Sequence, residues 1–390
     1  MYGNYKTKRA SEAWKLVMSN FTDDLWTEIF LRLPFESLLR FKSVSKTWFS
    51  IISSHRFAIS HLAIAPKDDQ ILIVHHEKGY PEDGEDGHFS FYHLDSRRIL
   101  ENLNFPYSQG EYPFKPEDSE LIGSECGIAC VSVCVSDWKA AKNNYDLYLW
   151  NPATKQSKLI PPYALHGYHM SDAALGFGFD HIDLDFKVVR VISCTRSAEV
   201  YSSNMNNWHK IKQKISDGPI KFHICFHGFL CALQHYSGSK GMVAFDLNKE
   251  VFICRINVPV SSFEFGSSSE IAQYKDSIAF IHSDSIMDGK INLWTLDNEA
   301  CLSGGGVEAS WTKVLILDVG VPFLFVEGLF NNTQFLLFGV GGDRLLYNSN
   351  NKSSTEVPGY PNIATCEFFK YTKSLFSLTG FKRIKWAAPS

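Results

Sequence analysis

Hydrophobic positions follow two different periods along this chain. Up to about residue 62, apolar side chains recur at steps of three and four residues, the spacing of one helix face. From there on, short apolar segments alternate with turns rich in Gly, Asn, Asp and Ser, which is typical of strands joined by hairpins. We therefore expect a flexible segment at residues 1–20, a small helical unit at residues 21–62 and an all-β domain at residues 63–390.

Three short helices are predicted in the helical unit. Leu25, Ile29 and Leu33 mark the apolar face of the first helix. Pro34 ends this helix because proline lacks an amide donor, and Ser45 suits the N-cap of the third helix. So small a unit cannot bury all its large apolar side chains alone, so either another protein or the chain's own C-terminal domain should cover part of them.

One motif recurs along the β-rich part: an aromatic residue followed by short polar residues that suit a hairpin turn. The aromatics are 58, 51, 44, 49 and 53 residues apart. Six copies at this period predict a six-bladed propeller, so the whole chain is an α+β multidomain protein. We expect the ring to close by pairing of residues 367–378 with residues 70–76. The six aromatics are Tyr92, Trp150, Tyr201, Phe245, Trp294 and Tyr347.

Composition agrees with this fold and argues against some function classes. Apolar residues make up 45% of the chain, and its 30 Phe, 16 Tyr and 9 Trp favour β-sheets. A net charge of −4 provides no field to hold a nucleic acid. With no secretory signal and no apolar run of spanning length, we expect no membrane partner and a cytoplasmic and/or nuclear location. Nine cysteines without framework spacing suit reduced thiols.

Two clusters contain side chains that can bind zinc, but neither has the spacing of a zinc site. Their members have even separations, so in a strand they would share one face, whereas zinc ligands usually come from shorter Cys pairs at turns. We expect buried thiols and ordinary histidines here, with no metal and no cofactor. The clusters are Cys126, Cys130 and Cys134, and His223, Cys225, His227 and Cys231.

Three aspartates, Asp180, Asp183 and Asp185, invite comparison with a calcium loop. An EF-hand needs glycine at its sixth position and glutamate at its twelfth, and both are absent, so a hairpin turn is predicted instead. The glycine cluster at residues 339–342 lacks the Lys-Ser/Thr pair of a phosphate loop and is also predicted to be a turn.

The run DDLWTEIFLRLPFESLLRFKSVSKTW at residues 23–48 resembles the plant F-box in order and spacing. Later segments, among them LWNPAT at 149–154 and FHGFL at 226–230, resemble the plant F-box-associated domain, a kelch-like propeller. The resemblance implies docking to a Skp-family adaptor and, through it, to the cullin and RING subunits of an SCF-type ubiquitin ligase. Carried over by position, the adaptor-binding residues, as contacts or as supports of the contacts, are Phe21, Leu25, Ile29, Leu33, Pro34, Leu38, Val44 and Trp48.

This sequence departs from the F-box pattern at Phe21 and Thr22, where the family usually has Leu-Pro. We expect Phe21 to fill an apolar pocket and Thr22 to cap the first helix. The resemblance implies a non-catalytic subunit whose propeller binds a protein target for ubiquitination, which the sequence does not identify. A scaffold outside the ligase and a propeller enzyme stay open as alternatives. Loops expected at residues 77–88 and 303–310 could vary the specificity for that target.

Overall fold

A computed structural model describes most of the chain, which divides into two compact units. One unit comprises Met1–Lys67 and Lys373–Thr379, and the other comprises Asp68–Thr372 and Gly380–Ser390. Three predicted features lie outside the described residues: the flexible segment at residues 1–20, Phe21, and residues 77–87 of the loop expected at residues 77–88. The described residues are 22–64, 71–76, 88–103, 118–137, 142–162, 173–213, 215, 219–236, 239–262, 266–285, 287–304, 306–357 and 366–383.

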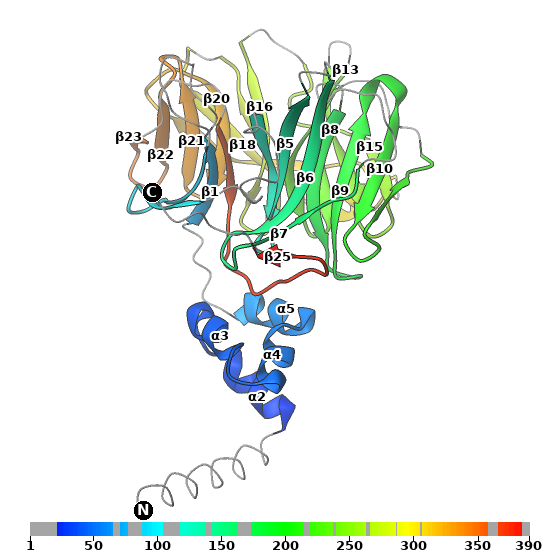
Figure 1. Ribbon diagram of the computed structural model, residues 1–390. Coiled ribbons are helices and arrows are strands. Elements are labelled where there is room, and N and C mark those ends of the chain that lie inside the picture. The colour runs from blue at the N-terminus through cyan, green and yellow to red at the C-terminus, as the bar shows by residue number, and fades with distance from the viewer. Residues whose placement is uncertain are drawn as a thin grey trace, which may run out of the picture. The chain divides into compact units, whose positions relative to one another are not determined.

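The first unit, which we call the head, has four helices in its described part, one more than predicted (Figure 1). Thr22 and Ser45 cap two of them as predicted: their Oγ atoms accept hydrogen bonds from the amides of Leu25 and Trp48 at 3.3 and 3.1 Å. The additional helix buries Phe57, Ala58 and His61. Because the buried His61 is polar, the apolar spacing that predicts a helix is interrupted in this part of the sequence. The helices are α2 (Asp23–Phe30), α3 (Phe35–Phe41), α4 (Lys46–Ile52) and α5 (His55–Ile64).

Aromatic rings from α2, α3 and α4 form the centre of the head. Trp48 lies 4.9 Å from Trp26, 5.1 Å from Phe30 and 5.3 Å from Phe41, measured between ring centroids. Tilted and edge-on pairs of this kind add to the burial of apolar area. His61 of α5 donates a hydrogen bond from Nε2 to the carbonyl oxygen of Leu33 at 3.0 Å, which ties the fourth helix to the loop after α2.

In the second unit the described strands form six antiparallel sheets arranged as the blades of a propeller (Figure 1). The innermost strand of each blade contacts the innermost strand of the next blade all round the ring. This confirms the predicted six-bladed propeller. Blade 1 contains β24 (Cys366–Lys370), β1 (Ile71–His76), β2 (His88–His93) and β3 (Arg98–Leu103); blade 2 contains β4 (Asp118–Glu125), β5 (Ile128–Asp137), β6 (Lys142–Asn151), β7 (Gln156–Leu159) and the short β25 (Lys382–Arg383).

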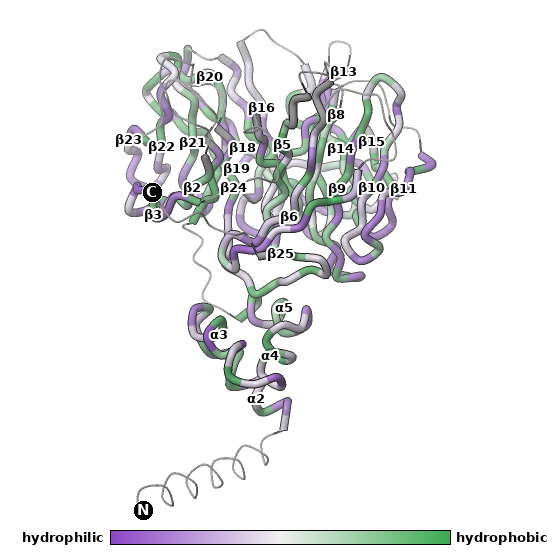
Figure 2. Tube along the Cα trace, in the orientation of Figure 1, coloured by the Kyte–Doolittle hydropathy of each residue, from purple (hydrophilic) through white to green (hydrophobic). Residues whose placement is uncertain are grey.

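The other four blades have four strands each, in chain order from the inside outwards. Hydrophobic and hydrophilic residues are interspersed along these strands, as expected for sheets that face neighbours and solvent (Figure 2). Blade 3 contains β8 (Ala173–Asp180), β9 (Asp185–Ile192), β10 (Ser197–Ser202) and β11 (Asn207–Lys210); blade 4 contains β12 (Ile220–Phe226), β13 (Phe229–Tyr236), β14 (Ser239–Asp246) and β15 (Val251–Ile256); blade 5 contains β16 (Ser268–Tyr274), β17 (Ser277–Ser283), β18 (Lys290–Leu296) and β19 (Trp311–Asp318); blade 6 contains β20 (Phe323–Phe330), β21 (Gln334–Gly339), β22 (Arg344–Asn348) and β23 (Ser353–Glu356).

The six repeat aromatics occupy the same place in every blade. Each lies near the end of the third strand from the centre, just before the connection to the fourth strand. Five of them are buried, and the sixth, Trp294, is half-buried with the ammonium group of Lys313 over its ring. The repeat in the sequence therefore arises from one packing position that recurs around the ring.

The ring closes as predicted, by pairing of a strand near the C-terminal end with the first strand of the propeller. Ile73 of β1 pairs with Phe369 of β24, and His75 pairs with Glu367. The predicted closing segment, residues 367–378, is too long, because pairing ends at Lys370 and Lys373–Thr379 belongs to the head. In the part of the chain that is described, no helix is both long and apolar enough to cross a membrane.

Blades 3 and 4 approach each other closely at glycine residues of β8. A Cβ atom on Gly178 would lie 2.7 Å from Cδ1 of Leu247 and 2.8 Å from Sγ of Cys225, closer than real contacts allow. A side chain at this point of β8 would require these buried neighbours in blade 4 to shift. The sequence motif GFGFD at residues 176–180 thus has a packing role.

We predict that Gly178→Val lowers the free energy of unfolding of the propeller by at least about 2 kcal/mol, because blade 4 must shift to admit the side chain. Urea denaturation followed by tryptophan fluorescence measures this loss. Ala173→Val, at the half-buried start of the same strand, is the control and should change stability much less. Equal losses in the two variants would show that the close approach is not the cause.

Candidate functional site

The head exposes several of the apolar residues predicted to bind the adaptor. Leu25 and Ile29, one helical turn apart on α2, are 45% and 36% exposed, and Val44 before α4 is 58% exposed. Pro34 is also exposed, while Leu33 is half-buried. Apolar side chains held at the surface by a folded unit favour contact with another protein.

Two of the predicted residues have an internal, supporting position. Leu38 is fully buried in the head, which fits a support of the contact residues and not a contact itself. Trp48 is half-buried in the aromatic centre. Sequence reasoning also missed Phe49, which is 55% exposed. The sequence contains a signal for this exposure. Adjacent residues point to different faces of a helix, so Trp48 and Phe49 of the short helix α4 cannot both point into the head.

Lys42 lies in the head at the end of α3. Burial lowers the pKa of its ammonium group to about 8, so a fraction of this side chain is neutral near physiological pH. Lys42 is half-buried, so the charge of its side chain depends on how far it is buried. Cover by a partner would lower this pKa further.

The cysteine and histidine clusters do not gather as predicted. Cys130 and Cys134 share β5, but Cys126 lies in the preceding turn with φ of 49°. His227 also occupies a turn, so His223 and Cys225 on β12 are separated from Cys231 on β13. The expectation that the members of each cluster share one face of a strand is therefore wrong for both clusters. The Cys126-Gly127 and His227-Gly228 pairs form tight hairpin turns instead. Within the described residues, no three His, Cys, Asp or Glu side chains are placed to hold a metal ion.

Glu125 is the last residue of β4, the innermost strand of blade 2, and directly precedes Cys126 in the turn. Burial raises the pKa of its carboxyl group to about 8. The same burial, together with the nearby Glu125 charge, raises the pKa of the Cys126 and Cys225 thiols. Thiols of this kind are poor nucleophiles, which argues against a cysteine-based reaction at this end of the ring.

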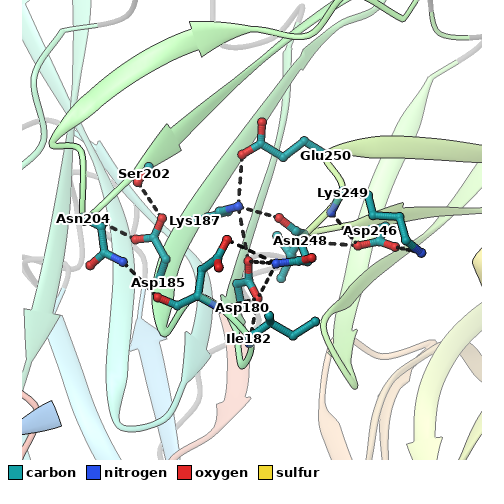
Figure 3. A network of polar contacts seen from close by, with 12 residues as sticks. Asp180, Ile182, Asp185, Lys187, Ser202, Asn204, Asp246, Asn248, Lys249 and Glu250 are labelled. Carbon is teal, nitrogen blue, oxygen red and sulfur yellow. Dashed lines mark hydrogen bonds and ion pairs between the residues drawn. The ribbon is translucent and has the colours of Figure 1, made fainter. Parts of the chain in front are cut away.

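The three aspartates form the predicted hairpin between β8 and β9, and their carboxylates are engaged in a polar network (Figure 3). Asp185 accepts hydrogen bonds from Ser202 Oγ at 2.5 Å, Ser203 Oγ at 2.7 Å and the amide of Asn204 at 2.9 Å. These bonds fasten the β8–β9 hairpin to the turn after β10. The carboxylate is occupied by fixed donors, so it is suited to structure and not to proton transfer.

The centre of this network is the buried ammonium group of Lys187, which links blades 3 and 4 (Figure 3). It donates to the carbonyl of Leu247 at 2.6 Å and to Glu250 at 3.0 Å, and it lies 3.4 Å from Asp180. Burial alone would raise the pKa of Asp180, but hydrogen bonds from Ile182 and Asn248, with the charge of Lys187, hold it below its ordinary value. Two carboxylates thus offset the cost of burying this cation.

One arrangement has the connectivity of a catalytic serine, histidine and acid. His75 Nε2 lies 2.8 Å from Ser119 Oγ, and its Nδ1 lies 2.8 Å from the Glu367 carboxylate. Ser119 is only 7% exposed and His75 is fully buried, and Glu367 also accepts the amide of Leu121 at 3.0 Å. A substrate carbonyl cannot reach Ser119 in this state, so the arrangement serves to hold β24, β1 and β4 together.

Comparison with known families gives two matches. A model of the F-box domain matches residues 18–60, the region of the head helices. A model described as the F-box associated beta propeller domain matches residues 85–303, more than half of the chain. Each match lies within one of the two compact units of the structure.

Similar proteins come from Arabidopsis thaliana. F-box protein CPR1 is 25% identical over 347 residues, which cover 77% of this chain and 74% of CPR1. F-box/kelch-repeat protein At3g23880 is 29% identical over 207 residues, which cover 48% of this chain and 50% of that protein. Among solved structures, TolB from Acinetobacter baumannii matches with a TM-score of 0.44 and 11% identity, covering 84% of this chain and 72% of that one.

We predict that Lys187→Met lowers the free energy of unfolding by about 3 kcal/mol, because two buried carboxylates lose their common cation. Urea denaturation followed by tryptophan fluorescence provides the measurement. Lys249→Met is the matched control: its ammonium group pairs with Asp246 but is 61% exposed, so a change below about 0.5 kcal/mol is expected. Similar losses in both variants would contradict a special role for Lys187.

A second prediction concerns pH. The Glu125 carboxyl keeps its proton up to about pH 8 when folded, whereas in the unfolded chain it loses the proton near its ordinary pKa, so it weakens the fold as pH rises between these values. Glu125→Gln should remove this loss. Its stability relative to wild type should therefore be greater at pH 8 than at pH 5, as measured by urea denaturation. The exposed Glu120→Gln is the control, and parallel curves for Glu125→Gln and wild type would refute the prediction.

Proposed function

This chain belongs to the family of F-box proteins with an F-box associated beta propeller domain, and from this we propose that it is the substrate-recognition subunit of an SCF-type ubiquitin ligase. In this proposal the head binds a Skp-family adaptor, which connects it to cullin and RING subunits. The propeller binds the protein that is to be ubiquitinated. The complex acts in the cytoplasm and/or the nucleus.

The exposed apolar residues of the head are the observation that supports adaptor binding most directly. Leu25, Ile29 and Val44 lie in the region that matches the F-box domain, and each remains accessible in the folded head. Burial of such side chains at an interface contributes most of the binding energy when they are central and well packed. The internal role of Leu38 fits the same picture, because it keeps the helices in place.

In the proposed role the protein performs no bond chemistry. It holds a target close to the ubiquitin-loaded enzyme, and this proximity raises the rate of transfer. The buried thiols of raised pKa, the saturated Asp185 carboxylate and the inaccessible Ser119 support binding over catalysis. A propeller with rigid blades and variable connecting loops suits recognition of a protein surface.

We predict that Leu25→Asp weakens binding of the Skp-family adaptor by about 30-fold or more, because a charge replaces an apolar contact at the interface. Isothermal titration calorimetry of the full chain with purified adaptor measures the affinity. Ile64→Asp in α5 is the matched control, since Ile64 is an exposed apolar residue of the head outside the matched F-box region. Its affinity should stay within about twofold of wild type.

The outcome also separates the ligase role from a scaffold outside the ligase. Wild-type protein that folds but shows no affinity for any Skp-family adaptor would reject the ligase role. Equal weakening by Leu25→Asp and Ile64→Asp would place the interface elsewhere on the head.

A further inference from the structure

A segment from near the C-terminal end of the chain is part of the head. Lys373–Thr379 groups with Met1–Lys67 and not with the propeller, although propeller strands β24 and β25 precede and follow it. The matched F-box region ends at residue 60 and does not include this segment. The structural head is therefore larger than the sequence motif that marks it.

Most of this segment is buried. Ser374 and Phe376 are fully buried, and Leu375 and Leu378 are almost so. Buried apolar side chains such as these contribute on the scale of core residues to the unit in which they lie. The segment is thus a buried part of the unit to which it belongs and is not an exposed loop.

Named contacts join the segment to the F-box helices. The ring of Phe376 lies 5.6 Å from that of His55 in α5, in an edge-on arrangement. His55 Nε2 lies 3.4 Å from the carbonyl oxygen of Ser377, which is 322 residues away in the sequence. Lys373 forms a 3.0 Å ion pair with Glu36 of α3, and this hydrogen bond is the main reason why the pKa of Glu36 lies below its ordinary value.

We propose that Lys373–Thr379 is a positioning element of the adaptor-binding head, which the head needs to hold α3 and α5 in their binding arrangement. A helical unit of this size cannot build a sufficient core alone, and these residues supply the missing apolar side chains. Adaptor affinity then depends on residues far from the F-box motif. The adaptor part of this proposal rests on the proposed function; the structural part does not.

The test compares Phe376→Ser with Phe376→Leu in the full chain. Adaptor affinity, measured by calorimetry, should fall about tenfold or more for Phe376→Ser, while Phe376→Leu keeps apolar volume and should stay within about threefold of wild type. Thr379→Ala, at the exposed end of the same segment, should not change the affinity. Amide hydrogen exchange of α3 and α5 should accelerate in Phe376→Ser, with exchange in the propeller strands unchanged.

The possible outcomes separate this proposal from the proposed function. If wild type binds the adaptor and Phe376→Ser binds equally well, the positioning role is overturned while the ligase role stands. If wild type does not bind, the ligase role fails, and hydrogen exchange then decides whether the segment stabilises the head. Faster exchange in α5 of Phe376→Ser would support the structural role of the segment, and unchanged exchange would overturn it.

Discussion

Pairing of β24 with β1 is the constraint on which the rest of the structure depends. It joins strands almost 300 residues apart, supplies blade 1 with its innermost strand and places β24 between the innermost strands of blades 2 and 6. Without it, two sheet edges would open, and the ring would lose the contacts of β24 with β4 and with β20. His75 reinforces the closure through Glu367 on β24 and Ser119 on blade 2. The next residues after β24 complete the core of the head, so closure and head assembly depend on adjacent parts of the chain.

Three buried cations of the propeller are paired with carboxylates in ways that favour rigidity. Lys187 links blades 3 and 4, Arg190 pairs with Glu199 at 3.0 Å within blade 3, and Arg344 makes two hydrogen bonds to Glu327 at 2.8 and 3.0 Å in blade 6. Each buried charge would be costly alone and is tolerated because its partner is fixed by the fold. A ring held in this way can present loops in constant positions, which suits selection of a partner more than movement of protons.

Much of the fold could be predicted from the sequence because its signals are local or periodic. Thr22 and Ser45 cap helices through bonds to residues three positions later, and the six aromatics recur because every blade repeats one packing position. The sequence did not separate contacts from supports, as for the buried Leu38, because helical spacing shows that a residue is apolar but not which neighbour covers it. The head segment at Lys373–Thr379 was missed for a related reason: its partners lie at the other end of the chain, and no local pattern records them.

In the proposed receptor, the head alone engages the ligase core. Hydrogen exchange of the full chain, with and without a Skp-family adaptor, tests this role most directly, because it locates the bound surface without altering a residue. We expect slower exchange in α2, α3 and α4 on binding, with the strands of all six blades unchanged. Protection confined to the propeller, or no protection in these helices at saturating adaptor, would contradict it.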